Sequence, residues 1–269
     1  MRHPSGAAIA ATILIGVSQP AVAEGMFDGL RGDWYLTVGA AAISAPAFEG
    51  ARSNRLRLSP MISLGKAGPQ ARFVSRNDNI SLSLYDNGAL RAGIAGKLIW
   101  GRDSNDYAVL NGVHSIPFGG EAGVFAEVYP TDWLRVRGEA RYGIRSHSGV
   151  VVDVAADAFH DITDTVRISA GPRLSAASEG YFDAYYGVNN AESLASGLTR
   201  FTPSSGGLKS VGAGGAITWK TTDQFTTSLF GEYARLQGPA ARSSIVRERG
   251  SRDQLTLGVS ATYRFDFTF

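Results

Sequence analysis

The 269-residue sequence contains no cysteine, so it has neither disulfides nor the Cys-rich sites that bind zinc or carry out redox chemistry. Its 26 Lys and Arg are nearly balanced by 24 Asp and Glu, which gives a formal net charge of +2. This balance gives no support for nucleic-acid binding, which favours strongly basic proteins. Beyond residue 23, no apolar run approaches the roughly 20 residues that a transmembrane helix needs.

The last sixteen residues, Gln254–Phe269, alternate strictly between two kinds of side chain. The odd-numbered positions are apolar, and the even-numbered positions are polar or glycine. A repeat of two is the side-chain period of a β-strand. Strands of soluble sheets are usually only about five or six residues long. A longer strand with one apolar face and one polar face is typical of a transmembrane β-barrel.

The apolar face of this stretch ends in aromatic residues, and the sequence ends on Phe269. A C-terminal strand of this kind resembles the sorting signal of bacterial outer-membrane proteins. We therefore expect the outer-membrane lipid and the barrel-assembly machinery to be partners of this protein. The expected assembly signal consists of Tyr263, Phe265, Phe267 and Phe269.

The N-terminus has the pattern of a secretory signal peptide. A short positive start at Arg2 is followed by the apolar run Ala7–Val17 and by the small residues Ala21-Val22-Ala23. This order predicts cleavage after Ala23 and export of the mature chain. We expect residues 1–23 to be the signal peptide and residues 24–269 to be one outer-membrane β-barrel domain.

Period-two patterns recur along the mature chain and predict an all-β, antiparallel transmembrane barrel of about twelve strands. Tight turns, such as Asp86-Asn87-Gly88, alternate with long connections. An even number of strands with short turns on one side is the bacterial outer-membrane pattern. Two of the twelve are short strands at Gln70–Arg76 and Asn79–Tyr85. If Gln70–Tyr85 forms one long bent strand instead, the number of strands is closer to ten.

The polar faces of the expected strands carry many charged residues of both signs. An Arg or Lys that faces lipid near the bilayer midplane costs about 2–4 kcal/mol. We therefore expect these faces to line the barrel interior. The expected interior set is Arg55, Arg57, Arg91, Lys97, Glu121, Glu127, Arg135, Arg137, Glu139, Arg141, Asp153, Asp157, Arg167, Arg173, Glu232, Arg264 and Asp266.

Two structures are compatible with a charged interior. The opposing charges could line a polar pore, or they could form a salt-bridged plug that packs a narrow barrel and conducts nothing. A barrel of about twelve strands is intermediate in size between barrels filled by side chains and the open sixteen-strand porins. The sequence leaves both possibilities open.

The sequence offers little for catalysis. The histidines of the mature chain are His114, His147 and His160, and all fall in expected surface loops or turns. None has the evident partners of a Ser-His-Asp triad. The oxygen-bearing residues around Asp103 and Asp106 lack the ligand pattern of an EF-hand calcium site. We therefore expect no enzymatic activity, no bound metal and no cofactor.

Several motifs follow one another in the C-terminal third of the chain. They are Tyr181-Phe182-Asp183-Ala184-Tyr185-Tyr186-Gly187-Val188, Gly206-Gly207-Leu208-Lys209-Ser210-Val211, Tyr233-Ala234-Arg235-Leu236 and Tyr263-Arg264-Phe265. Their order resembles the MipA/OmpV family, the MltA-interacting outer-membrane proteins. Gly32-Asp33-Trp34 looks similar too, so the resemblance extends over nearly the whole mature chain. Ser210 and Ser243-Ser244 depart from it, since the family usually has Asp and Ser-Pro there.

The resemblance implies a barrel without catalysis. Its founding member is similar to a scaffold that brings a periplasmic lytic transglycosylase and a murein synthase together. Other relatives are linked to adhesion or to the passage of small solutes. We therefore carry three hypotheses forward: a scaffold for murein enzymes, a narrow channel for small charged solutes, and a surface adhesin that uses the long loop Ala176–Ser205.

Overall fold

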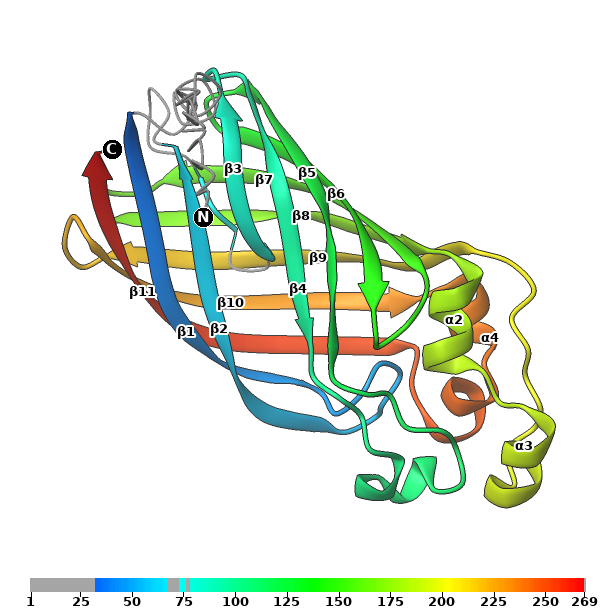
Figure 1. The fold of residues 1–269 in the computed structure, drawn as a ribbon. Coiled ribbons are helices and arrows are strands. Elements are labelled where there is room, and N and C mark those ends of the chain that lie inside the picture. The colour runs from blue at the N-terminus through cyan, green and yellow to red at the C-terminus, as the bar shows by residue number, and fades with distance from the viewer. Residues whose placement is uncertain (1–31, 67–72, 76–77, 269) are drawn as a thin grey trace, which may run out of the picture.

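A computed structural model describes residues 32–66, 73–75 and 78–268 of the chain. The described strands form one closed β-barrel, so the expected all-β barrel is confirmed (Figure 1). Around the barrel the strands follow the order β1-β11-β10-β9-β8-β7-β6-β5-β4-β3-β2, and β2 closes the ring on β1. The expected signal peptide lies outside the described residues and stays a prediction.

The barrel strands are long. The longest, β11, contains sixteen residues. In chain order they are β1 (Asp33–Pro46), β2 (Asn54–Lys66), β3 (Ile80–Asp86), β4 (Leu90–Ile99), β5 (Gly119–Thr131), β6 (Leu134–Ile144), β7 (Val150–Asp161), β8 (Val166–Ala177), β9 (Gly207–Lys220), β10 (Phe225–Leu236) and β11 (Asp253–Thr268).

The barrel side chains have the opposite arrangement from those of a soluble protein. In β11, Leu255, Leu257 and Val259 are exposed on the outside, whereas Gln254 and Ser260 are buried on the inside. Because exposed apolar surface is unfavourable in water and favourable in lipid, this alternation fits a wall in contact with a bilayer. Among the described residues, no helix has the length and apolarity to cross a membrane.

The two ends of the barrel differ in their connections. One end, here called the turn end, has the short connections 87–89, 132–133, 162–165 and 221–224. The other end, here called the loop end, has the connections 47–53, 100–118, 145–149, 178–206 and 237–252. Asp33 pairs with Thr268, so β1 begins and β11 finishes at the turn end (Figure 1).

The described barrel has eleven strands, so the expected number of twelve is wrong. The expected strand Asn79–Tyr85 corresponds to β3. Of the expected strand Gln70–Arg76, only Phe73–Ser75 is described, and these residues are not in a strand. With one strand fewer, β3 runs parallel to β2, and the two strands pair only between Ser63–Gly65 and Ser81–Ser83.

The missing strand has a physical explanation in the barrel interior. Phe73 and Ser75 are buried, and Asp78 forms ion pairs with an arginine of the opposite wall, Arg135. An antiparallel hairpin after β2 would keep Asp78 in the wall. The connection from β2 to β3 instead places Phe73–Ser75 and Asp78–Asn79 inside the barrel. We call these five described residues the inner segment.

The apolar core of the described structure lies in the loop end. The helices there are α2 (Glu179–Tyr186), α3 (Asn190–Ser196), α4 (Gly238–Arg242), η2 (Ser104–Asp106), η3 (Ala108–Leu110) and η4 (Ile245–Arg249) (Figure 1). Tyr181, Phe182 and Tyr186 of α2 share one buried cluster with Ala240 of α4 and Val246 of η4. The loop end is therefore a folded cap, which the period-two patterns do not reveal because its helices are short.

The inside-out arrangement gives a direct test on β11. We expect Val259→Arg to lower the free energy of unfolding by about 2–4 kcal/mol, because the guanidinium would face lipid near the middle of the strand. Leu194→Arg is the control, since Leu194 is 89% exposed on α3 in the cap. Urea unfolding of the refolded protein in lipid vesicles measures both. Equal effects of the two substitutions would contradict the lipid-facing assignment of β11.

Candidate functional site

The inner wall formed by β4 to β8 carries a dense set of charged side chains. On β6, the four charged residues from Arg135 to Arg141 alternate with other residues, so all four point into the lumen and are buried. The strand register places Arg135 beside Asp157 of β7, and Arg137 beside Glu127 of β5. Strand alternation and antiparallel pairing together therefore produce a buried ion network.

We call this set the lumen network. Its five arginines and seven carboxylates, among the described residues, are Arg91, Arg135, Arg137, Arg141, Arg173, Asp78, Glu121, Glu127, Glu139, Asp153, Asp157 and Glu232.

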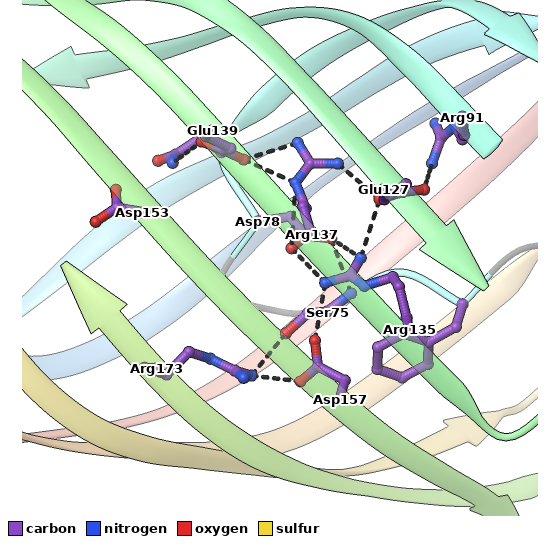
Figure 2. Close-up of polar contacts among 12 residues, drawn as sticks. Ser75, Asp78, Arg91, Glu127, Arg135, Arg137, Glu139, Asp153, Asp157 and Arg173 are labelled. Carbon is purple, nitrogen blue, oxygen red and sulfur yellow. Dashed lines mark hydrogen bonds and ion pairs between the residues drawn. The ribbon is translucent and has the colours of Figure 1, made fainter. Parts of the chain in front are cut away.

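Arg135 is the centre of the network, and its side chain is fully buried. Its two terminal nitrogens donate to both carboxylate oxygens of Asp78, at 2.7 and 2.8 Å. The same guanidinium donates to Asp157 at 2.9 Å and lies 3.4 Å from Glu127 (Figure 2). Two-pronged contacts between arginine and carboxylate are among the strongest hydrogen bonds in proteins. Arg135 therefore ties β5, β7 and the inner segment together.

Glu127 of β5 is the second junction. It accepts hydrogen bonds from Arg91 and Arg137, each at 2.9 Å, and from the hydroxyl of Tyr129, also at 2.9 Å. Arg137 continues the network to Glu139, with an ion pair at 2.7 Å. These contacts link β4, β5 and β6 across the turn half of the lumen.

Arg141 extends the network toward the loop end. It donates to Glu121 at 2.8 Å and forms short contacts with Glu139 and Asp153. A ring nitrogen of His147 lies 3.2 Å from Glu121. The network therefore extends along much of the barrel axis.

The inner segment is held by this network and by aromatic contacts. The ring of Phe73 stacks on Phe159 of β7 at 4.6 Å, and the guanidinium of Arg135 lies 5.1 Å from the same ring. The amide of Asn79 donates to Glu139 at 2.7 Å. Figure 2 shows Asp78 and Ser75 among the charged side chains of the wall. The inner segment therefore occupies lumen space that an open pore would leave to water.

Buried charges need partners, because removing an ion from water costs several kcal/mol even after relaxation. In the lumen network most charges contact more than one opposite charge, and the low dielectric strengthens each attraction. Of the two possibilities left open by the sequence, this arrangement resembles the salt-bridged plug rather than the polar pore.

A cavity of about 470 Å³ lies in the lumen between the network and the cap. Its lining includes Glu49, Lys97, Asp153 and Lys209. On the cap side, Glu49 accepts hydrogen bonds from the hydroxyls of Tyr181 at 2.6 Å and of Tyr186 at 3.0 Å. The ammonium of Lys209 lies 3.4 Å from the same carboxylate. Glu49 thus joins the cap to the barrel wall.

The ionisation of these groups favours the contact. Burial alone would raise the pKa of Glu49, but Lys209, Lys97 and the two tyrosine hydroxyls outweigh it and lower that pKa. Burial raises the pKa of Tyr181 well above its ordinary value, so its hydroxyl stays protonated and donates. The contact between cap and wall is therefore complete at neutral pH.

The remaining sequence-predicted residues lie outside the lumen network. Arg55, Arg57 and Lys97 line cavities on the loop side of it. Near the turn end, Arg167 pairs with Asp161, and Arg264 pairs with Asp266. Of the expected assembly signal, Tyr263 and Phe265 are exposed, Phe267 is partly buried, and Phe269 lies outside the described residues. Their role in assembly stays a prediction.

The assignment of the histidines to surface loops and turns needs correction. His147 is buried, because it packs against Tyr181 and contacts Glu121. His114 lies 2.7 Å from Glu192 in the cap, and His160 is part of β7. No group of three or more potential metal ligands occurs among the residues that the structure describes.

Sequence reasoning missed several residues of the site. Asp78 falls in what reads as a turn between two short strands, and Glu49 falls in a loop. Lys209 falls in an expected strand and carries no separate signal. Only the unusual number of arginines on β6 indicated that acidic partners were needed nearby. Nothing in the local pattern identifies the inner segment as their source.

The sequence profile of the family described as MltA-interacting protein MipA matches residues 38–265. The chain belongs to the MipA family. The match spans β1 to β11 and contains the complete lumen network. No curated protein sequence matches the chain significantly.

Similar solved structures are bacterial proteins at low sequence identity. Neisserial surface protein A is 10% identical, covers 87% of this chain and 99% of its own, and has a TM-score of 0.27. The CymD monoaromatic hydrocarbon channel is 12% identical, with 96% and 95% coverage and a TM-score of 0.34. The outer membrane protein OprG from Pseudomonas aeruginosa is 10% identical, with 87% and 96% coverage and a TM-score of 0.25. These scores are too low to indicate function.

The lumen network predicts a large difference between buried and exposed arginines. We expect Arg135→Gln to lower the free energy of unfolding by about 3–5 kcal/mol, because it leaves buried carboxylates without their partner. Arg167→Gln is the control, because its ion pair with Asp161 is partly exposed and should be worth about 0–1 kcal/mol. Urea unfolding in lipid vesicles compares the two. A loss for Arg135→Gln no larger than the control would contradict the network's stabilising role.

Proposed function

We propose that this protein is a non-enzymatic barrel of the bacterial outer membrane that acts as a scaffold. It would hold a periplasmic lytic transglycosylase and a murein synthase together at the membrane. Membership in a family described as MltA-interacting supports the partner class. The observation that carries the proposal is the lumen network with its inner segment, because a filled lumen favours a role at the barrel surface over transport.

The turn end is the surface that a periplasmic partner would reach, since short turns of bacterial barrels face the periplasm. The connections 162–165 and 221–224 are exposed there. A specific protein interface buries about 1,600 Å² in total. Several turns would therefore act together, along with residues 24–31, which lie outside the described residues.

A narrow channel for small charged solutes is the second candidate. The cavity of about 470 Å³ favours it, because Arg57, Lys97 and Glu232 line a polar chamber on the loop side. A solute passing from this chamber to the turn end would have to displace the contacts of Arg135 and Arg137. Because of this requirement, we rank the channel as a less favoured function than the scaffold.

The scaffold proposal predicts that partner capture depends on the turn end. Immobilised protein should retain a purified periplasmic lytic transglycosylase. Replacing residues 162–165 and 221–224 by Gly and Ser should weaken this binding by about tenfold or more, because contact area is lost. Biolayer interferometry measures both affinities.

Leu194→Ser, in the cap at the opposite end, is the control and should leave capture unchanged. A gel-shift assay shows that each variant has formed its barrel. Undiminished capture by the turn variant would overturn the scaffold proposal.

A further inference from the structure

The barrel is closed, but the pairing of β2 with β3 is short among the described residues. β3 pairs with β2 only at Ser63–Gly65, so the preceding part of β2, Asn54–Ile62, has no strand partner on that side among the described residues. On its other side the same stretch pairs with β1 throughout. Pro60 lies within this stretch, and proline, which has no backbone N–H, is confined mainly to strand edges.

An open strand edge is unusual in a membrane protein. Lipid offers no hydrogen bonds, so unpaired backbone groups at membrane depth are tolerated where they line a cavity. A cavity of about 660 Å³ lies at this edge, between β2 on one side and the end of β4 with residues 100–102 on the other. We call it the side cavity. Its volume falls in the range of about 300–1,000 Å³ that is usual for small-molecule sites.

The lining of the side cavity is amphipathic, because β2 and β4 each alternate at this point. On the membrane face, Leu58 is 75% exposed, and Leu98 and Trp100 are exposed opposite it. On the lumen face of the same strands lie Arg57 and Lys97. The cavity therefore has an apolar side toward the membrane and a cationic side toward the lumen.

The lining of the side cavity carries more positive than negative charge, with Arg57, Lys97 and Arg102 against Glu49 and Asp78, although Lys97 also attracts the carboxylate of Glu49. Arg57 and Lys97 make no ion pair in the described part of the chain, unlike the arginines of the lumen network. The two carboxylates that line the cavity, Glu49 and Asp78, already pair with Lys209 and Arg135. The site is therefore positively charged, with its carboxylates already engaged.

Arg102 adds a buried cation to this wall. Its side chain lines the side cavity, yet the residue is only 6% exposed. Its terminal nitrogens donate to the backbone carbonyls of Tyr185 at 3.1 Å and His114 at 3.3 Å, and its Nε atom has no hydrogen-bond partner. Burial lowers the pKa of Arg102, and the neighbouring Tyr185, Tyr186 and Glu49 offset this effect only in part.

We infer that the side cavity binds an amphipathic anion that enters sideways from the membrane. The ligand class is a membrane amphiphile with an acyl chain and a carboxylate or phosphate head. Its head would meet Arg57, Lys97 and Arg102, and its chain would lie between Leu58 and Trp100. This site is on the loop side of the lumen network, so the inference does not depend on the scaffold role.

Trp100 provides the reporter for a test. A variant that keeps only Trp100 has Phe at Trp34, Trp133 and Trp219, and is refolded into nanodiscs of neutral phosphatidylcholine. Dibromostearate, an anionic acyl chain that quenches tryptophan at short range, should quench Trp100 with saturation. A second variant that keeps only Trp219, on β9, reports partitioning into the bilayer and should show no saturation.

Charge neutralisation tests the cationic wall. Arg57→Gln with Lys97→Gln should weaken the binding of dibromostearate to the Trp100 variant by about tenfold or more, because both charge-assisted contacts are lost. Neither residue has an ion pair to lose, so the barrel should still form, as a gel-shift assay verifies. Arg235→Gln, at the exposed end of β10, is the matched control and should not alter binding.

Three results would overturn the inference. The first is equal, non-saturating quenching of Trp100 and Trp219. The second is an affinity for dibromostearate that is unchanged when Arg57 and Lys97 are replaced by Gln. The third is a dimer in which Trp100 is shielded and does not respond to dibromostearate, because the open edge of β2 would then pair with a second copy of the chain.

Discussion

A buried guanidinium must be matched by carboxylates, and Arg135 shows how far that requirement extends in this barrel. β5 and β7 supply Glu127 and Asp157, but the two-pronged contact comes from Asp78, which belongs to no strand. Asp78 therefore lies in the lumen and not in a strand of the wall. β3 runs parallel to β2, and the described strands number eleven.

The same requirement accounts for the filled lumen. The lumen network extends from Glu127 to Arg141 and Glu121 toward the loop end, and the inner segment packs against it. This filling supports the proposed scaffold over a channel. The cavities lie on the loop side, beneath a cap whose apolar core is separate from the polar lumen. Among the described residues, the short pairing of β2 with β3 leaves the edge of β2 beside Leu58 without a strand partner, where the side cavity lies.

Much of this fold follows from the sequence, because a membrane-spanning strand must alternate between lipid and lumen. Gln254 to Phe265 alternates in the structure as it does in the sequence. The inner segment could not be predicted from the sequence, because Phe73–Ser75 has no local feature that distinguishes it from a short strand. The cap helices are too short to show the helical period of apolar residues in the sequence. The burial of His147 depends on packing against Tyr181, which is distant in the sequence.

Single-channel conductance of the refolded mature protein in a planar bilayer tests the central claim most directly. If the lumen network and the inner segment fill the barrel, the folded protein should show no steady conductance at moderate voltage. Steady conductance that changes when Arg135 or Arg137 is replaced by Gln would contradict the account, because those side chains would then line an open path rather than a plug.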